Sequence, residues 1–122
     1  MWDNFTRDEL KCKCGCNRVA MNIYFMDQIQ AMRTELGFPF HVTSAYRCPR
    51  HNNLVSNTGF NGVHVEGIAI DLSVNGNQAY QIMTVAKQYG ITGIGLQQHK
   101  GKPRFIHLDA GVGSNRPIIF TY

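Results

Sequence analysis

Apolar residues recur at helical spacing near the start of the chain. Over residues 21–36 they follow one another at intervals of four, three and four, on one helical stripe: Phe25, Ile29, Met32 and Leu36. Gly37 comes directly afterwards, and glycine readily ends a helix. The pattern predicts an amphipathic helix over residues 21–36. We interpret its methionine and aromatic side chains as core, with no cofactor role.

Three further segments predict helices. Residues 78–89 carry a second apolar face, formed by Ile82, Val85, Ala86 and Tyr89. Asn75 is suited to cap this helix and Gly90 to close it. Thr6 and Glu9 have the spacing of a capping box, which predicts one short helical turn. Residues 50–56 can form another short helix.

Five segments predict strands, most of them late in the chain. They are residues 38–44, 68–73, 91–97, 104–109 and 117–122. Helices that come mostly early, with strands grouped late, favour an α+β fold. We therefore expect helices packed on one face of a mainly antiparallel sheet, in one domain over residues 1–122.

The strand at residues 68–73 carries a carboxylate among apolar neighbours. Its alternating pattern makes Asp71 project from one face of the sheet. Burying this charge is costly unless it is paired, hydrogen-bonded or bound to a metal. His64 lies seven residues earlier, across a bend at Gly67, where it can supply another metal ligand.

The strand at residues 104–109 adds a second histidine. His107 and Asp109 are two residues apart, so both side chains leave the same face. If this strand lies beside the one with Asp71, then His64, Asp71 and His107 converge. Two imidazoles and one carboxylate make the ligand count of a catalytic zinc site, with a fourth position for water. For either histidine alone, a hydrogen-bonded strand residue is the simpler alternative.

Composition narrows the class of protein. The chain has 122 residues, of which 43% are hydrophobic, enough for one core in one small domain. Its net charge of +4 favours an anionic partner, but the basic residues are scattered and do not interleave with aromatics. We expect no nucleic acid, and a polyanionic cell wall fits the charge.

The sequence shows no targeting signal that we can recognise. The N-terminus lacks the basic start and apolar run of a secretory signal, and no apolar stretch is long enough to span a membrane. We therefore expect a soluble protein made in the cytoplasm, and we expect a monomer.

Several short motifs together resemble one known family. They are Ser44-Ala45-Tyr46-Arg47, then Cys48-Pro49-Arg50-His51-Asn52, His64-x-x-Gly67-x-Ala69-x-Asp71, Gly93-Ile94-Gly95 and Phe105-Ile106-His107-Leu108-Asp109. In this order they resemble the D-alanyl-D-alanine carboxypeptidase-like zinc peptidases, which share a metal-site fold with lysostaphin-type peptidases and the hedgehog domain. The resemblance runs from about Phe5 to Asp109. It is closest to short, single-domain members encoded by bacteriophages and prophages.

The resemblance implies roles for individual residues. The zinc ligands fall on His64, Asp71 and His107, and the arginine of the Ser-x-Tyr-Arg motif falls on Arg47. In relatives this arginine stabilises the charge that develops on the attacked carbonyl, a task suited to the planar donors of a guanidinium. An ordinary surface cation is the alternative for Arg47.

The general base is open. Many relatives have an acidic residue three positions before the last histidine ligand, but this chain has Arg104 there, which cannot accept a proton. Asp109 is our first choice, because shorter relatives also show His-x-Asp. Glu66 comes second and His99 third. Asp109 can instead be a partner that orients an imidazole.

The four cysteines form a separate question. Cys12, Cys14, Cys16 and Cys48 can make a structural zinc site, one or two disulfides, or free thiols. The Cys-x-Cys-x-Cys spacing lacks the usual gaps between zinc ligands, and the lack of a signal peptide favours reduced thiols. Relatives often combine such a cluster with the cysteine after Tyr-Arg, which implies that Cys48 lies near it.

Two functions follow from the resemblance. The first is a zinc metallopeptidase that binds peptidoglycan stem peptides and hydrolyses a bond next to a D-amino acid, as a carboxypeptidase or an endopeptidase. Such an enzyme would be an endolysin-like protein, released by a phage or associated with the virion, that acts on the cell wall. The second is a catalytically weak, zinc-stabilised wall-binding or virion-structural module. Arg104 favours the second function, whereas Arg47 with all three ligand types favours the first.

Overall fold

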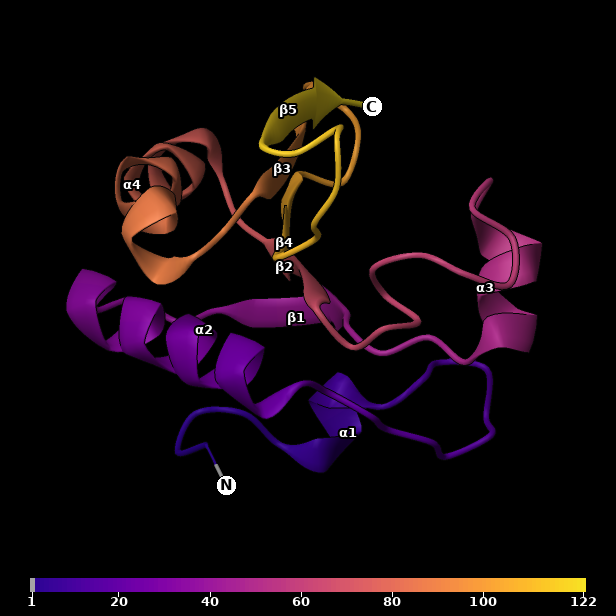
Figure 1. The fold of residues 1–122 in the computed structure, drawn as a ribbon. Coiled ribbons are helices and arrows are strands. Elements are labelled where there is room, and N and C mark those ends of the chain that lie inside the picture. Colours follow the sequence, from indigo (N-terminus) through magenta and orange to yellow (C-terminus); the bar gives the residue numbers. More distant parts are fainter. Residues whose placement is uncertain (1) are drawn as a thin grey trace.

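The computed structural model describes residues 2–122, and Figure 1 shows their arrangement. Five strands form one sheet in the order β1-β2-β4-β3-β5: β1 His41–Ser44, β2 Ala69–Ser73, β3 Gly93–Gln97, β4 Phe105–Asp109 and β5 Ile118–Thr121. The first three pairings across the sheet are antiparallel, and β3 pairs with β5 in parallel. The fold is α+β with a mostly antiparallel sheet, which confirms the predicted fold class.

Local sequence signals account for the four helices. They are α1 Arg7–Leu10, α2 Ile23–Leu36, α3 Pro49–Val55 and α4 Gly76–Ala86, and a 3-10 turn at Lys87–Tyr89 extends α4. Thr6 and Glu9 form the predicted capping box of α1. Asn22 caps α2 through its side chain, and Gly37 ends this helix in a left-handed conformation, with φ of 75°.

The core lies between one face of the sheet and the helices α2 and α4. Both helices lie on the same side of the sheet in Figure 1. Their buried side chains pack with alternate residues of the central strands: Phe25, Met26, Ile29, Met32, Ile82, Ala86, Ile70, Leu72, Ile106 and Leu108. The residues between these strand positions therefore face the opposite side of the sheet.

The observed strands are shorter than the predicted ones. The first strand begins at His41 instead of residue 38, because its pairing with β2 starts at His41 and does not include Phe38, Pro39 and Phe40. The last begins at Ile118, after a cis bond between Arg116 and Pro117. Among residues 2–122, no helix is both long and apolar enough to cross a membrane.

Candidate metal centre

Strand register brings Asp71 and His107 together. The two residues are direct partners in the antiparallel pairing of β2 with β4. Their neighbours Ile70, Leu72 and Leu108 point into the core, so both polar side chains face away from α2 and α4.

A turn before β2 delivers His64 to the same place. The turn bends at Gly67, whose φ of 73° is a left-handed conformation that side chains rarely adopt. A Cβ at this position would also collide with the carbonyl oxygen of Ala20. The backbone oxygen of Gly67 accepts a hydrogen bond from Asn22, which ties the turn to the start of α2. This glycine is therefore required by the path of the chain that presents His64.

Each histidine has one ring nitrogen fixed by a hydrogen bond outside the group of candidate metal ligands, and its other ring nitrogen faces Asp71. Nδ1 of His64 donates to the carbonyl oxygen of Ala45 at 2.7 Å, which leaves Nε2 as an acceptor. Nε2 of His107 donates to Oδ2 of Asp109 at 2.8 Å, which leaves Nδ1. Such hydrogen bonds set the tautomer and the orientation of metal-binding imidazoles.

The two nitrogens that face Asp71 and the Asp71 carboxylate fit a zinc ion. Oδ1 of Asp71 lies 2.9 Å from Nδ1 of His107 and 3.5 Å from Nε2 of His64. All three ligand atoms lie within 4.8 Å of one another. Ligands about 2.0–2.1 Å from a tetrahedral zinc ion are separated by about 3.3 Å. The donor set and its spacing therefore match zinc.

The site is open on one side. Among residues 2–122, the metal-ligand group contains these three side chains and no fourth histidine, cysteine or carboxylate. His64 and His107 line a cavity of about 270 Å³ that also contacts Arg47, Asn52, Phe120 and Tyr122. Three protein ligands beside a cavity are the arrangement of catalytic zinc sites, whereas structural sites are closed.

Electrostatics favour a cation between the two carboxylates. Burial tends to raise the pKa of the Asp71 carboxyl, but hydrogen bonds from His107 and His64 outweigh it and hold the pKa well below its usual range. Burial tends to lower the pKa of His107, whereas hydrogen bonds to Asp109 and Asp71 raise it to about 9. In the metal-free protein at neutral pH, a proton on His107 supplies the positive charge that an ion would otherwise supply.

Arg47 is held beside the metal ligands. Its Nε donates to Oγ of Ser44 at 3.3 Å and its Nη1 to Oδ1 of Asn52 at 3.0 Å. Nη2 lies 3.7 Å from Oδ2 of Asp71, and the side chain is only 18% exposed. An ordinary surface cation is mobile and solvated, whereas this guanidinium has a fixed position on the cavity wall.

Asn52 joins Arg47 to the loop that leads to His64. The side chain is buried, and Nδ2 lies 2.8 Å from Thr58 Oγ1, 2.7 Å from the Gly59 carbonyl oxygen and 2.8 Å from that of Asn61. Asn52 belongs to the Cys-Pro-Arg-His-Asn motif, which by itself indicates no role for the asparagine side chain. Nothing local in the sequence shows that an asparagine on a short helix binds a loop six to nine residues away.

Asp109 is fully buried and both of its oxygens are engaged. Oδ2 accepts from His107 and from Nη2 of Arg116 at 3.0 Å, whereas Oδ1 accepts from Nε of Arg116 at 3.1 Å and from the Gly111 N–H at 2.9 Å. Burial tends to raise the pKa of Asp109, but the hydrogen bonds from His107 and Arg116 keep it well below its usual range. The carboxylate therefore stays ionised and fixed against His107.

The two other candidates for the general base lie away from the cavity, as does Arg104. Glu66 is exposed on the turn before β2, and His99 is exposed in the loop after β3. Arg104 directly precedes β4. In the described part of the chain, none of the three is among the side chains that line the cavity.

The C-terminal strand completes the cavity wall, which the sequence analysis did not foresee. The Phe120 ring lies 5.5 Å from that of His107, in space left by Gly95, where a Cβ would approach the Phe120 ring to 2.6 Å. Partial burial raises the pKa of the Tyr122 phenol to about 12, and the charge of Asp71 adds to the shift. Tyr122 is therefore a hydrogen-bond donor at neutral pH.

The four cysteines gather at a different place. Cys12, Cys14 and Cys16 lie on the segment after α1, and Cys48 precedes α3. Their sulfur atoms lie within 4.8 Å of one another, and none is in a disulfide bond. The structure thus forms two separate groups of metal-binding side chains, one with nitrogen and oxygen donors and one with sulfur donors.

Two imidazoles and a carboxylate around an open position, next to a fixed arginine, are the arrangement typical of metal-dependent hydrolases. The family model described as Peptidase M15 matches residues 3–109, and the chain belongs to this family of zinc peptidases. No curated protein matches the sequence. The matched region contains all three metal ligands, Arg47 and Asp109, whereas Arg116, Phe120 and Tyr122 follow it.

Proposed function

We propose that the chain is one zinc peptidase domain that hydrolyses a peptidoglycan peptide bond next to a D-amino acid, as a carboxypeptidase or an endopeptidase. The observation that supports this most directly is the convergence of His64, Asp71 and His107 within 4.8 Å, beside a cavity. Zinc held by these residues would polarise the substrate carbonyl and lower the pKa of a bound water to about 7.

In this proposal, Arg47 binds the negative charge of the substrate. Its two hydrogen bonds to Ser44 and Asn52 leave Nη2 directed toward Asp71. A donor fixed before the reaction costs no reorganisation when charge develops on the attacked carbonyl. The same guanidinium suits the terminal carboxylate of a carboxypeptidase substrate. Tyr122, whose raised pKa keeps the phenol neutral, is placed to add a second donor beside the charged guanidinium.

Asp109 is proposed to be a positioning residue. It accepts from His107 on one side and from Arg116 and Gly111 on the other, which uses both oxygens. An aspartate bound in this way keeps the His107 ring in place and increases its basicity toward a metal. A general base needs a free oxygen within reach of the water proton. The contacts of Asp109 therefore support the orienting role more than the role of proton acceptor.

A wall-binding module with little catalysis is the second candidate function. It is favoured by Arg104 at the position of the usual acidic residue and by the lack of a free carboxylate on the cavity wall in residues 2–122. Such a module would keep the zinc and the peptide-binding cavity while hydrolysing slowly.

Digestion of purified sacculi distinguishes the two functions. We expect the zinc-loaded protein to release peptides whose masses identify the bond: loss of a terminal D-alanine for a carboxypeptidase, or cut stem peptides and cross-links for an endopeptidase. Metal removal should abolish release and added zinc should restore it.

Matched variants locate the activity. His64→Ala and His107→Ala should each abolish peptide release, whereas His99→Ala, which changes an exposed histidine away from the cavity, should retain it. Hydrolysis that persists after metal removal would rule out the peptidase mechanism. Zinc-dependent binding to sacculi without any product would support the binding module.

A further inference from the structure

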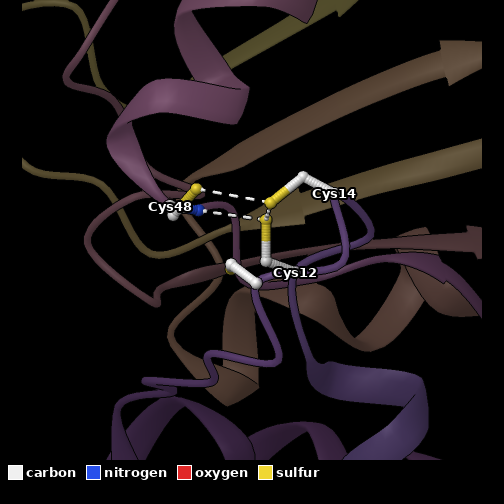
Figure 2. A group of neighbouring side chains, drawn as sticks. Cys12, Cys14 and Cys48 are labelled. Carbon is white, nitrogen blue, oxygen red and sulfur yellow. Dashed lines mark hydrogen bonds between the residues drawn. The ribbon is translucent and has the colours of Figure 1, made fainter.

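The four cysteines come from two segments far apart in the sequence. Cys12, Cys14 and Cys16 lie between α1 and α2, and Cys48 is the N-cap residue of α3. Figure 2 shows the side chains of Cys12 and Cys14 pointing toward Cys48 across the gap between these segments. All four sulfur atoms lie within 4.8 Å of one another.

The distances between sulfur atoms match thiolates around one metal ion. Sγ of Cys14 lies 3.5 Å from Sγ of Cys12 and 3.7 Å from Sγ of Cys48. Thiolates about 2.3 Å from a tetrahedral zinc ion are separated by about 3.8 Å. A disulfide requires a separation of about 2.0 Å. The sulfur of Cys14 lies close to both Cys12 and Cys48. This arrangement suits three sulfur atoms bound to one metal ion better than a disulfide between Cys14 and one of its neighbours.

Backbone N–H groups donate to two of the sulfur atoms, and arginines lie beside the cluster. The backbone N–H of Cys48 donates to Sγ of Cys12 at 3.3 Å, and that of His51 donates to Sγ of Cys48 at 3.4 Å. Arg18 and Arg50 line the hollow beside the cysteines, and the described residues around it include no carboxylate. Four thiolates around one divalent ion leave two negative charges, which these arginines can offset.

The segment with the three cysteines is held to α1 by side-chain hydrogen bonds of Arg7 and Lys13, which do not reach α3. Residues 11–22 contain no helix or strand, and the loop is closed by one backbone hydrogen bond, from Cys12 to Arg18 at 2.8 Å. The buried residues next to it form a cluster of only Cys12, Tyr46 and Cys48, with Met21 packed against it. A cross-link between this loop and α3 would therefore contribute strongly to its stability.

We propose that Cys12, Cys14, Cys16 and Cys48 bind a structural zinc ion, separate from the site at His64, Asp71 and His107. Four protein ligands close the coordination sphere, so this ion has a structural role. The ion also fixes the backbone on one side of Arg47, because Cys48 is the next residue. On the other side of Arg47, the backbone N–H of Tyr46 donates to the Leu10 carbonyl oxygen at 3.1 Å. The proposal does not depend on peptidase activity.

Cobalt substitution of the wild-type protein tests the proposal without any variant. The histidine and aspartate site contains no sulfur, so a thiolate-to-cobalt charge-transfer band can arise only from the cysteines. We expect this band, two bound metal ions per chain, and four thiols that react with a thiol reagent only after metal removal. A reduced protein with one metal ion and four freely reactive thiols would overturn the proposal. Two disulfides, seen as the loss of four hydrogens in the intact mass, would overturn it as well.

Variants assign the second ion to the cysteines. Cys14 and Cys16 are exposed, so the double change Cys14→Ser/Cys16→Ser removes two ligands without altering the buried side chains of Cys12 and Cys48. It should lose one zinc ion per chain and the charge-transfer band, and lower Tm by more than about 5 °C. Lys13→Ser changes the same loop without removing a thiol and should keep both ions. A double variant with two zinc ions would refute the assignment, and if this variant does not fold, the wild-type spectrum still decides.

Discussion

The contacts of Asp109 separate two roles that a carboxylate beside a zinc site can have. Its side chain has no exposed surface, and it binds His107, Arg116 and the Gly111 N–H at the same time. A proton acceptor must exchange protons with the reacting water, whereas an orienting residue acts through the imidazole it holds. The two roles therefore differ in their effect on metal affinity.

Asp109→Asn is expected to weaken zinc binding and turnover together, each by about 10- to 100-fold. The amide replaces one acceptor oxygen with a donor, which conflicts with one N–H of Arg116 in either orientation and with His107 or the Gly111 N–H as well. Competition with a chromogenic chelator measures the affinity, and release of peptides from sacculi measures turnover.

The control for this substitution is Asp8→Asn, because Asp8 lies on α1 with a side chain that is 86% exposed. It should change neither quantity. A large loss of turnover by Asp109→Asn with unchanged zinc affinity would instead make Asp109 the proton acceptor.

At the scale of single residues, the sequence indicated the convergence of the candidate metal ligands better than the contacts of their partners. His64, Asp71 and His107 are chemically distinctive, and the alternation in each strand gives the face on which they lie. The hydrogen bonds of Asn52 and Arg116 depend on side chains that meet only after the chain folds. Neither residue type nor spacing indicates such contacts.

Among the elements, β3 leaves room for the Asp109 carboxylate because it has a glycine, Gly93, opposite Asp109. Gly93 is the direct partner of Asp109 in the antiparallel pairing of β3 with β4. A Cβ at residue 93 would lie 2.5 Å from Oδ1 and Cγ of Asp109. Because hydrogen bonds hold this carboxylate on two sides, it cannot move away easily. The Gly93-Ile94-Gly95 motif thus leaves room for Asp109 at one glycine and for Phe120 at the other.

Gly93→Ala is therefore expected to lower the free energy of unfolding by about 1–3 kcal/mol and to weaken zinc binding. Denaturant unfolding of the zinc-loaded protein measures the first effect, and chelator competition measures the second.

Gly76→Ala is the matched control. Gly76 is exposed at the start of α4, and an added Cβ would meet only Oε1 of Gln98, at 3.8 Å. This change should leave stability unchanged or slightly raised. Equal stability and zinc affinity of both variants would mean that the close packing of Gly93 against Asp109 has no part in the site.

Element boundaries show which signals are local. The caps at Thr6 and Asn75 and the left-handed glycine after α2 were read from adjacent residues and were confirmed. The start of β1 at His41 was missed, because a strand begins where it finds a partner, and the partner of His41 is Ser73.

At the scale of the whole molecule, the sheet brings distant segments to one face. The metal ligands come from the turn before β2, from β2 and from β4, whereas Arg47 follows β1. The sequence predicts this convergence if the strands that carry Asp71 and His107 are neighbours. The strand order fulfils this condition, because β2 lies beside β4. The parallel pairing of β5 with β3, which adds Phe120 and Tyr122, had no signal in the sequence. Such a pairing depends on contacts between remote segments.

Part of the cavity wall lies outside the region that the family model matches. The match ends at residue 109, yet Arg116, Phe120 and Tyr122 all line the cavity. Residues beyond the match therefore contribute both the ion pair of Asp109 and an aromatic side of the cavity.

An anomalous difference map at the zinc absorption edge, from crystals of the protein supplied with zinc, tests the account most directly. We predict a peak about 2.0–2.2 Å from Nε2 of His64, Oδ1 of Asp71 and Nδ1 of His107, with no fourth side chain bound. The absence of a peak there, or a fourth protein ligand that closes the ion off from the cavity, would contradict a catalytic zinc site in this protein.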